Sequence, residues 1–196
     1  MQRKIVVPGE KIEGKVLNYV YRIGEEQYST IYGLLTETNG IKKIVPLKGK
    51  YTPKEGDLVI GIVEEVRYNG YLVDINSPYP GMLLSQRDYD YKDVLSAKVL
   101  KVDEIKKVML GEERKLFKGH LIEVLPVKVP RIIGKNNSMI NLIKEKTGSE
   151  IIVGRNGRIW IKGGDVAKAE EAILKIEKEA HTLGLTERIT KLLEGE

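Results

Sequence analysis

The pattern of hydrophobic and polar positions changes near residue 117. Before it, short apolar runs are separated by Gly, Pro, Asn and Asp, a pattern typical of strands and turns. The segment 71–77, YLVDINS, alternates apolar and polar side chains, as a half-buried strand does. Five such strands between residues 56 and 116 predict a small closed barrel.

Residues 1–55 are also predicted to be rich in β-structure. Asn39-Gly40 separates two apolar runs and predicts a hairpin, because both turn positions favour residues that tolerate positive φ. A second turn is expected over residues 22–27, RIGEEQ. The polar connector KGKYTPKEGD then marks a domain boundary after residue 55. So short a segment is expected to depend on another body for its stability.

Residues 117–196 combine strands with helices and predict an α+β domain. We expect a strand over 120–129 that Pro130 ends, then a helical turn at Ile132 and a helix that Gly148 ends. Two strands follow, joined by a hairpin at 156–157. Asp165 is expected to cap the next helix, whose single apolar stripe runs from Val166 to Ala180 and which Gly184 ends. A short closing helix follows. The predicted order is strand, helix, loop, helix, strand, strand, helix.

The loop between the two predicted helices is the most informative stretch of this domain. The segment 130–140, PRIIGKNNSMI, runs from two isoleucines through a glycine and a polar loop into an apolar helix face. Such a segment can present backbone N–H groups at a helix N-terminus to an anion. Residues 117–164 hold nine Lys and Arg against three Asp and Glu, the distribution expected for a polyanion partner or, equally, for a solvated face.

Composition excludes several classes of protein. The chain contains no cysteine, so disulfides, thiolate zinc sites and a cysteine nucleophile are excluded, and a reducing cytoplasm is expected. Charged residues or glycine interrupt every apolar run, so no membrane-spanning segment is expected. All ten tyrosines lie between Tyr19 and Tyr91, where they could be strand residues or stack on bases.

Candidates for catalysis and for metal or cofactor binding are weak. The sequence shows no phosphate-binding Walker loop, no Ser-His-Asp arrangement and no dinucleotide fingerprint. The histidines at 120 and 181 are far apart and are interpreted as structural. Asp88, Asp90 and Asp93 could hold Mg²⁺, but a solvated loop edge is the simpler interpretation. We therefore expect neither catalytic residues, nor a metal, nor a cofactor.

The stretch GDLVIGIVEEVRYNGYLVDI and the step PGMLL resemble the S1 RNA-binding domain, a five-stranded barrel of the oligonucleotide/oligosaccharide-binding type. The resemblance implies single-stranded RNA as ligand. It gives Tyr68 and Tyr71 the positions of base-stacking aromatics, with Lys98 and Lys101 as candidate phosphate partners. Leu84 departs from the family, since many S1 domains have a histidine near this position.

The final domain resembles the type I KH domain, in which a G-x-x-G loop between two helices contacts the nucleic-acid backbone. Here that loop corresponds to Gly134–Asn137, and Asn137 replaces the second glycine, so the loop could clamp phosphate or be structural. The resemblance implies that the RNA-binding residues are Arg131, Ile132, Ile133, Gly134, Lys135, Asn136 and Asn137, with Ile151 and Ile152 as further candidates for the groove.

A β-rich leader followed by S1 and KH domains, over essentially the whole chain, resembles the RNA-binding cap subunit of the archaeal exosome, of the ribosomal-RNA-processing-protein-4 type. The most telling stretches include IVPLKGKYTPKEGD and EIIVGRNGRIWIKG. A G-x-N-G motif, here Gly154, Arg155, Asn156 and Gly157, is structural in that family. The expected limits are 1–55 for a ring-docking domain, 56–116 for S1 and 117–196 for KH.

That resemblance implies a non-enzymatic subunit, present in three copies on a hexameric ring of RNase PH-like subunits. It would capture RNA, favour A-rich tails and guide the 3′ end to phosphorolytic sites in the ring, with a zinc-ribbon cap subunit as a possible further neighbour. Three alternatives stay open: a free RNA-binding regulator of transcription or translation, a nuclease that uses the 88–93 carboxylates, and the zinc-ribbon subunit itself, which the lack of cysteine disfavours.

Overall fold

The computed structural model describes residues 3–38, 40–180, 182 and 184–194. The chain divides into two compact units, residues 1–49 and residues 50–196. Within the residues described, no helix combines the length and the apolar character needed to cross a bilayer.

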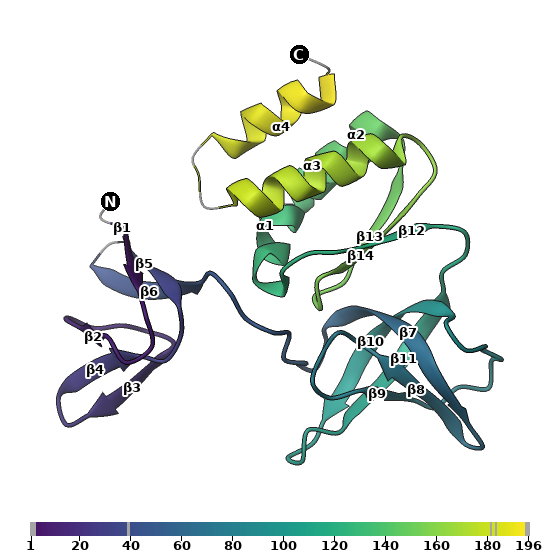
Figure 1. The fold of residues 1–196 in the computed structure, drawn as a ribbon, viewed down its shortest axis with the longest axis horizontal. Coiled ribbons are helices and arrows are strands. Elements are labelled where there is room, and N and C mark those ends of the chain that lie inside the picture. The colour runs from purple at the N-terminus through teal and green to yellow at the C-terminus, as the bar shows by residue number, and fades with distance from the viewer. Residues whose placement is uncertain (1–2, 39, 181, 183, 195–196) are drawn as a thin grey trace. The chain divides into compact units, whose positions relative to one another are not determined.

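The first unit consists of two three-stranded sheets, ordered β1-β5-β6 and β2-β4-β3 (Figure 1). Its strands are β1 (Arg3–Val6), β2 (Lys11–Ile12), β3 (Val20–Ile23), β4 (Glu26–Ser29), β5 (Gly33–Thr38) and β6 (Ile41–Pro46). The antiparallel pairs β5–β6 and β3–β4 confirm both predicted hairpins, although Asn39 itself lies outside the described residues.

The core of this first unit is small. Its fully buried apolar side chains in the described part are Val6, Ile12, Val16 and Ile44. The side-chain amide of Asn18 donates to the Ile44 carbonyl at 3.1 Å and accepts from the Ile44 amide at 3.0 Å, which holds the 16–18 segment to β6. With so little apolar burial, the unit has a limited stability of its own.

The second unit begins with a closed five-stranded barrel, as predicted. Its strands are β7 (Leu58–Arg67), β8 (Gly70–Asp74), β9 (Gly81–Leu83), β10 (Val94–Val102) and β11 (Val108–Lys115). They close in the order β10-β11-β9-β8-β7, because β7 also pairs with β10. All pairs are antiparallel except β9 with β11. The topology is that of the S1 and OB-type barrels.

The barrel also takes in part of the polar connector that precedes β7. Tyr51 is buried in the barrel core, and its hydroxyl donates to Asp57 Oδ2 at 2.9 Å. Burial, together with this bond to Asp57, raises the pKa of Tyr51, so the phenol stays protonated and keeps donating. From residue 50 onward the connector therefore belongs to the second unit. The predicted domain limits at 55 and 116 remain predictions.

The barrel is followed by a KH domain with the predicted order of elements. These are β12 (His120–Glu123), η1 (Pro126–Lys128), α1 (Val129–Ile133), η2 (Lys135–Asn137), α2 (Ser138–Thr147), β13 (Glu150–Val153), β14 (Arg158–Lys162), α3 (Val166–Glu179) and α4 (Leu185–Glu194). The three strands form an antiparallel sheet in the order β12-β14-β13. Asp165 caps α3 as predicted, since its carboxylate accepts from the Lys168 amide at 3.0 Å.

One predicted boundary in this domain is wrong. The strand expected over 120–129 ends at Glu123, and helical structure begins at Pro126. Pro130 lies in the first turn of α1 instead of ending a strand. A proline fits there because the first helical residues need no intrahelical N–H bond, and its fixed φ suits the helix.

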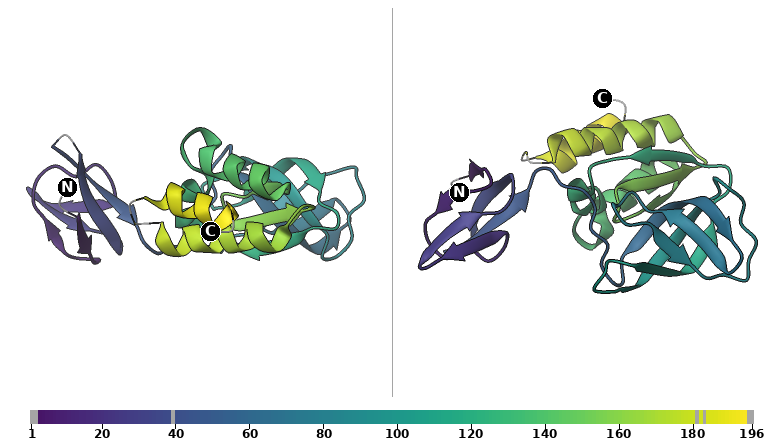
Figure 2. Two further views of the ribbon diagram at one scale, coloured as in Figure 1. Left: turned by 90° about the horizontal axis from the view of Figure 1, so that it is seen from above. Right: turned by 60° about the horizontal axis from the view of Figure 1, so that its bottom comes forward.

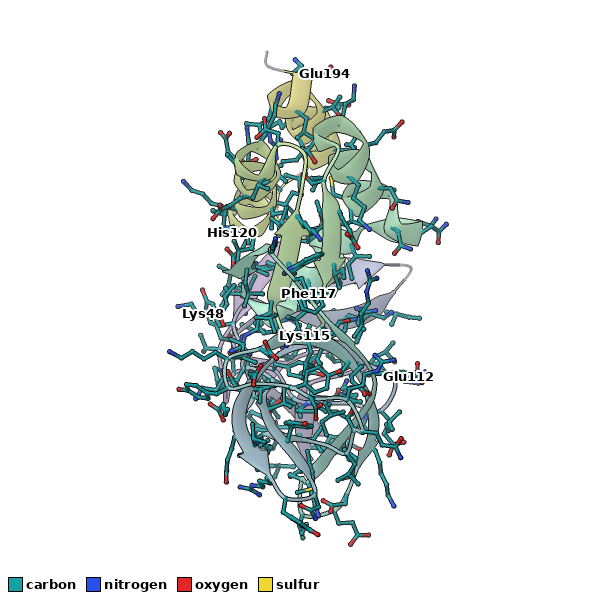
Figure 3. All side chains as sticks on the ribbon, turned by 90° about the vertical axis from the view of Figure 1, so that its right-hand side faces the viewer. Lys48, Glu112, Lys115, Phe117, His120 and Glu194 are labelled. Atoms are coloured by element: carbon teal, nitrogen blue, oxygen red, sulfur yellow. The ribbon has the colours of Figure 1, made fainter. Side chains whose placement is uncertain are left out.

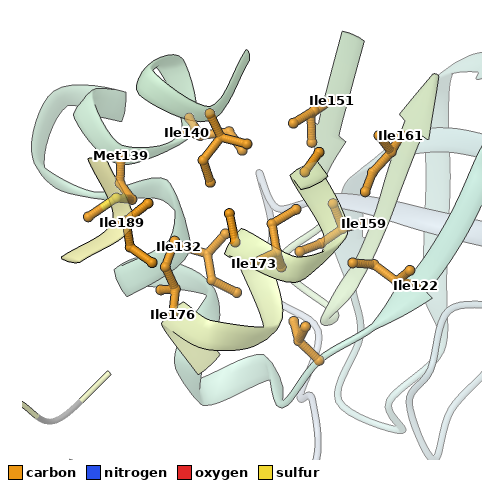
Figure 4. Close-up of a cluster of buried hydrophobic side chains, with 14 of the residues drawn as sticks. Ile122, Ile132, Met139, Ile140, Ile151, Ile159, Ile161, Ile173, Ile176 and Ile189 are labelled. Carbon is orange, nitrogen blue, oxygen red and sulfur yellow. The ribbon is translucent and has the colours of Figure 1, made fainter. Parts of the chain in front are cut away.

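The KH sheet is buried on both faces. On one face, Ile122, Ile151, Ile159 and Ile161 pack with apolar residues of α1–α4 (Figure 4). On the other face, Trp160 packs against Ile60 of β7 and against Leu116, with Leu121 and Ile152 beside them. The helices therefore cover the side of the sheet away from the barrel (Figure 2).

The β13–β14 turn fastens the KH sheet to the barrel through the side chain of Asn156, which is completely buried. Its amide donates to the carbonyls of Ile60 at 2.7 Å and Ile75 at 3.0 Å, and its Oδ1 accepts from the Ile60 amide at 3.2 Å. The neighbouring Arg155 amide donates to the Leu58 carbonyl at 2.7 Å. The turn thus adds hydrogen bonds to the ends of β7 and β8, far away in sequence.

The two glycines of G-x-N-G allow this approach. A Cβ at Gly154 would lie 2.2 Å from Asn156 Oδ1 and 2.9 Å from the Ile60 amide. Gly157 has a φ of +85°, and a Cβ there would lie 2.3 Å from the Val124 carbonyl. The motif is therefore explained by contact between the two domains, and the Arg155 side chain points to solvent.

Arg158 adds a buried ionic contact beside the turn. Its guanidinium donates to the Asp74 carbonyl at 2.7 Å and to Glu123 Oε1 at 2.8 Å, and also pairs with the Asp74 carboxylate. Asp74 belongs to the barrel and Glu123 to the KH domain. Because the arginine is buried, loss of a partner would leave a poorly solvated charge.

We predict that Asn156→Ala lowers the free energy of unfolding by about 3 kcal/mol, since three buried backbone groups of β7 and β8 lose their partner. Urea denaturation followed by circular dichroism measures this. The matched control is Asn141→Ala, an exposed position on α2. Equal stability of the two variants would contradict the role of Asn156.

Candidate nucleic-acid interface

The structure corrects the expected role of Tyr71. Its side chain is buried in the barrel core and meets the Tyr89 ring edge to face, with centroids 5.2 Å apart. Its hydroxyl donates to the Arg87 carbonyl at 2.9 Å and accepts from the Tyr89 amide at 3.3 Å. Tyr71 therefore offers no ring face to a base, and it fixes the 87–89 loop instead.

Tyr68 is fully exposed in the turn between β7 and β8. Lys98 lies on β10 opposite Leu58, at the start of β7, whereas Tyr68 follows its end. Ten strand residues at about 3.3 Å each put them roughly 30 Å apart along the strand. The barrel residues predicted to bind RNA are thus spread over both ends of the barrel.

The two candidate lysines differ in their surroundings. Lys98 Nζ lies 3.0 Å from Glu112 Oε1, so its charge is already paired. Lys101 is exposed, and no ion pair to it is found among the residues described. Of the two, Lys101 is more available to a phosphate.

The KH loop holds a conformation that normally requires glycine. Gly134 has a φ of +76°, and both Asn136 and Asn137 are left-handed, with φ of 52° and 62°. Asparagine tolerates this region better than other non-glycine residues, which explains how the loop forms without its second glycine. The Asn137 side chain does not cap α2, and the amide of Ser138, the first residue of that helix, donates to the Lys135 carbonyl instead.

The side chains around the loop divide into two groups. Arg131 and Lys135 are exposed, and within the described ranges neither forms an ion pair. Ile132 is fully buried in the KH core, which corrects the expectation that it contacts RNA. Ile151 packs on the helix-covered face of the sheet, and Ile152 packs on the face toward the barrel. Ile133 is half-buried. Arg131 and Lys135 therefore give the loop a cationic edge, while Ile133 and Ile152 are only partly exposed.

The alternative acidic site at residues 88–93 is not assembled. The Asp93 carboxylate pairs with Lys115 and accepts from the Asp90 amide at 2.7 Å. In the chain as described, no three His, Asp or Glu side chains gather as metal ligands would. His120 Nε2 lies 3.1 Å from Glu170 of α3, and His181 falls outside the described residues.

One feature of the structure was missed by the sequence analysis. An open cavity of about 470 Å³ lies between the barrel and the KH domain, lined by cations and by Tyr89, Phe117 and Trp160. The signal in the sequence was the position of Phe117 and Trp160, the only aromatic residues after Tyr91, both inside the most basic segment. Their proximity depends on the pairing of domains, which no local pattern reveals.

Known proteins resemble this chain along its full length. A family model described as the KH domain matches residues 119–167. The chain is 41% identical to the exosome complex component Rrp4 of Methanothermobacter thermautotrophicus, over 98% of this chain and 68% of the relative. It is 42% identical to Rrp4 of Thermoplasma acidophilum, over 97% and 90%, and 40% identical to Rrp4 of Thermofilum pendens, over 98% and 93%.

The chain belongs to the Rrp4 family of exosome complex components. This agrees with the resemblance drawn from the leader, S1 and KH stretches. A crystal structure of a protein assigned to the exosome complex as RNA-binding is also similar. It is 37% identical, has a TM-score of 0.68, and is matched over 75% of this chain and 97% of that one. This chain is therefore similar in sequence to Rrp4 proteins and similar in fold to a protein assigned to the exosome complex.

For this Rrp4 family member we predict that substitutions at the two barrel tyrosines differ in their effect on stability. Tyr71→Phe removes the hydroxyl that holds the 87–89 loop and lowers the free energy of unfolding by about 1 kcal/mol. Tyr68→Ala, at a fully exposed position, changes it by less than about 0.5 kcal/mol. Urea denaturation of both variants measures the difference, and a larger loss for Tyr68→Ala would contradict these placements.

Proposed function

We propose that the chain is a non-catalytic RNA-binding subunit of the archaeal exosome. It caps a hexameric ring of RNase PH-like subunits in three copies, beside a zinc-ribbon cap subunit where one is present. It captures single-stranded RNA, favours A-rich tails and guides the 3′ end to the phosphorolytic sites of the ring. Its limits are those predicted: a docking domain at 1–55, S1 at 56–116 and KH at 117–196. A cytoplasmic location fits a chain without cysteine.

The observation that carries this proposal is the match to relatives named as exosome components over 97–98% of the chain. A similarity confined to the KH domain would support RNA binding alone, since that module occurs in many settings. A match that also includes the small first unit favours membership of the exosome complex, because a unit with so small a core is expected to need a docking partner for its stability.

Support for RNA capture comes from the surfaces described above. The exposed ring of Tyr68 offers a stacking face at one end of the barrel. The exposed cations Arg131 and Lys135, beside the KH loop, offer contacts to a phosphate backbone. Lys101 adds a further unpaired charge. Among the described residues these sites offer ring faces and charges for binding, and none of them assembles a nucleophile, an acid–base pair or a metal site, which is why the proposal is non-catalytic.

Support for docking comes from the first unit. Ile5, Leu34 and Val45 are cross-strand neighbours on β1, β5 and β6. They form a row on the face opposite Leu35 and Ile44, which belong to the core. Ile5 is 53% and Val45 46% exposed. An exposed apolar row on so small a unit is typical of a protein interface.

We predict that Tyr68→Ala weakens binding of a labelled single-stranded oligoadenylate by about fivefold or more, because one stacked base is worth about 1–3 kcal/mol. Fluorescence anisotropy measures this, with Tyr79→Ala as the control at another exposed tyrosine. An unchanged affinity would remove Tyr68 from the RNA path.

We predict that Val45→Lys prevents co-purification with RNase PH-like ring subunits while leaving RNA affinity unchanged. A lysine in the apolar row puts an unpaired charge into the interface. The control is Leu174→Lys, which replaces an exposed leucine of α3. If the wild-type chain is found only as a free protein in native mass spectrometry of cell extracts, the alternative of an independent RNA-binding regulator is favoured.

A further inference from the structure

The cavity between the barrel and the KH domain has the size and composition of a nucleotide site. It lies among the 87–89 loop, the end of β11 with the following linker, and strands β13 and β14. Figure 3 shows Lys115 and Phe117 where the barrel meets the KH sheet. Its volume of about 470 Å³ falls in the range of small-molecule sites, roughly 300–1,000 Å³.

Positive charge predominates in the cavity. Four cationic side chains line it against the carboxylates of Asp88 and Glu150. Lys115 is neutralised by Asp93, and Arg114 lies 3.8 Å from Glu150. The other two cations, Arg87 and Lys162, form no ion pair among the residues described. Both charges therefore remain available to an anion.

Arg87 is held in place by uncharged partners. Its guanidinium donates to the Glu113 carbonyl at 3.0 Å, and its own carbonyl accepts from the Tyr71 hydroxyl at 2.9 Å. These bonds orient the side chain without cancelling its charge. A positioned and unpaired guanidinium is well suited to a phosphate.

Aromatic surface lies beside these charges. Phe117 is 58% exposed, unusual for a phenylalanine, and Lys115 Nζ lies 5.4 Å from its ring centroid. Trp160 is buried at the wall, with Lys162 Nζ at 5.9 Å from its ring. Exposed ring faces next to cations are the arrangement that stacks bases and holds the adjoining backbone.

A buried hydroxyl at the wall lacks a partner. Tyr89 is 4% exposed, and its hydroxyl lies next to the Arg87 guanidinium but forms no hydrogen bond of normal geometry with any described residue. Burial, and then the charge of Glu113, raise the pKa of Tyr89, so the phenol is neutral and able to donate. An unsatisfied buried hydroxyl costs free energy that a ligand oxygen in the cavity would recover.

We infer that this cavity binds one nucleotide of single-stranded RNA, with its phosphate against Arg87 and Lys162 and its base against Phe117. The inference rests on the RNA-binding function proposed above and adds a site at the junction of the two domains. An acidic peptide would also match the charge, but it would leave the exposed phenylalanine ring unused. Asp88 and Glu150 fit a base better, because they can accept from its amino groups.

Trp160 is the only tryptophan of the chain, so its fluorescence reports directly on this cavity. The full chain is titrated with a short single-stranded oligoadenylate while its 5′ label reports anisotropy and Trp160 reports emission. We expect both signals to saturate at the same RNA concentration. A polyglutamate peptide at equal charge is expected to leave Trp160 emission unchanged.

Two sets of variants assign the contacts. Arg87→Gln with Lys162→Gln is expected to reduce the slope of log affinity against log salt by about 0.7, the contribution of the one phosphate that these two side chains hold on a single strand. The matched control replaces two exposed helix lysines, Lys178→Gln with Lys191→Gln, and keeps the slope. Phe117→Leu is expected to weaken binding about fivefold, whereas Phe117→Tyr keeps wild-type affinity.

The outcomes separate this site from the proposed function. RNA binding by anisotropy without a change in Trp160 emission, and with variants equal to the control, would overturn the site and leave RNA capture standing. No binding at all by anisotropy would overturn both. A response of Trp160 to polyglutamate alone would replace RNA by an acidic protein segment. If Arg87→Gln disturbs folding, Lys162→Gln alone still tests the site, because the Lys162 side chain donates no hydrogen bond to any residue that the structure describes.

Discussion

The completely buried side chain of Asn156 is the contact on which the second unit depends. Alone, the β13–β14 turn would expose a polar tip, and the ends of β7 and β8 would leave backbone groups unpaired beside an apolar surface. The asparagine amide satisfies three of these groups, at Ile60 and Ile75, while Trp160 fills the space next to them. Directional hydrogen bonds fix the angle between the domains, which apolar packing alone would leave adjustable.

Under the proposed function, a fixed angle between the domains matters because the ligand is flexible. Single-stranded RNA loses conformational freedom wherever it is held, so contacts that are already in place cost less to use. Tyr68 and the KH loop lie on different domains, and the cavity lined by Arg87 and Phe117 lies between them. Asn156 holds the barrel and the KH sheet together, so the proposed RNA-binding surfaces on the two domains keep a fixed position relative to each other.

The sequence predicted much of this fold because local signals and tertiary structure agree. Strand alternation, hairpin turns and helix caps such as Asp165 are read within a few residues. Pro130 was misinterpreted because a proline is compatible with both a strand end and a first helical turn. Tyr71 and Ile132 were misassigned because a family position does not tell which way a side chain points. The cavity could not be predicted, since its walls come from segments that only the inter-domain contact brings together.

Native-state hydrogen exchange tests most directly whether barrel and KH domain form one cooperative body. The amides of Ile60 and Arg155 cross the junction, to Asn156 Oδ1 and to the Leu58 carbonyl. If the domains open only together, both amides exchange with the same free energy as the most protected amides of the barrel and of the KH sheet. Exchange of Ile60 and Arg155 at a clearly lower free energy, with both cores still protected, would show that the domains separate while folded.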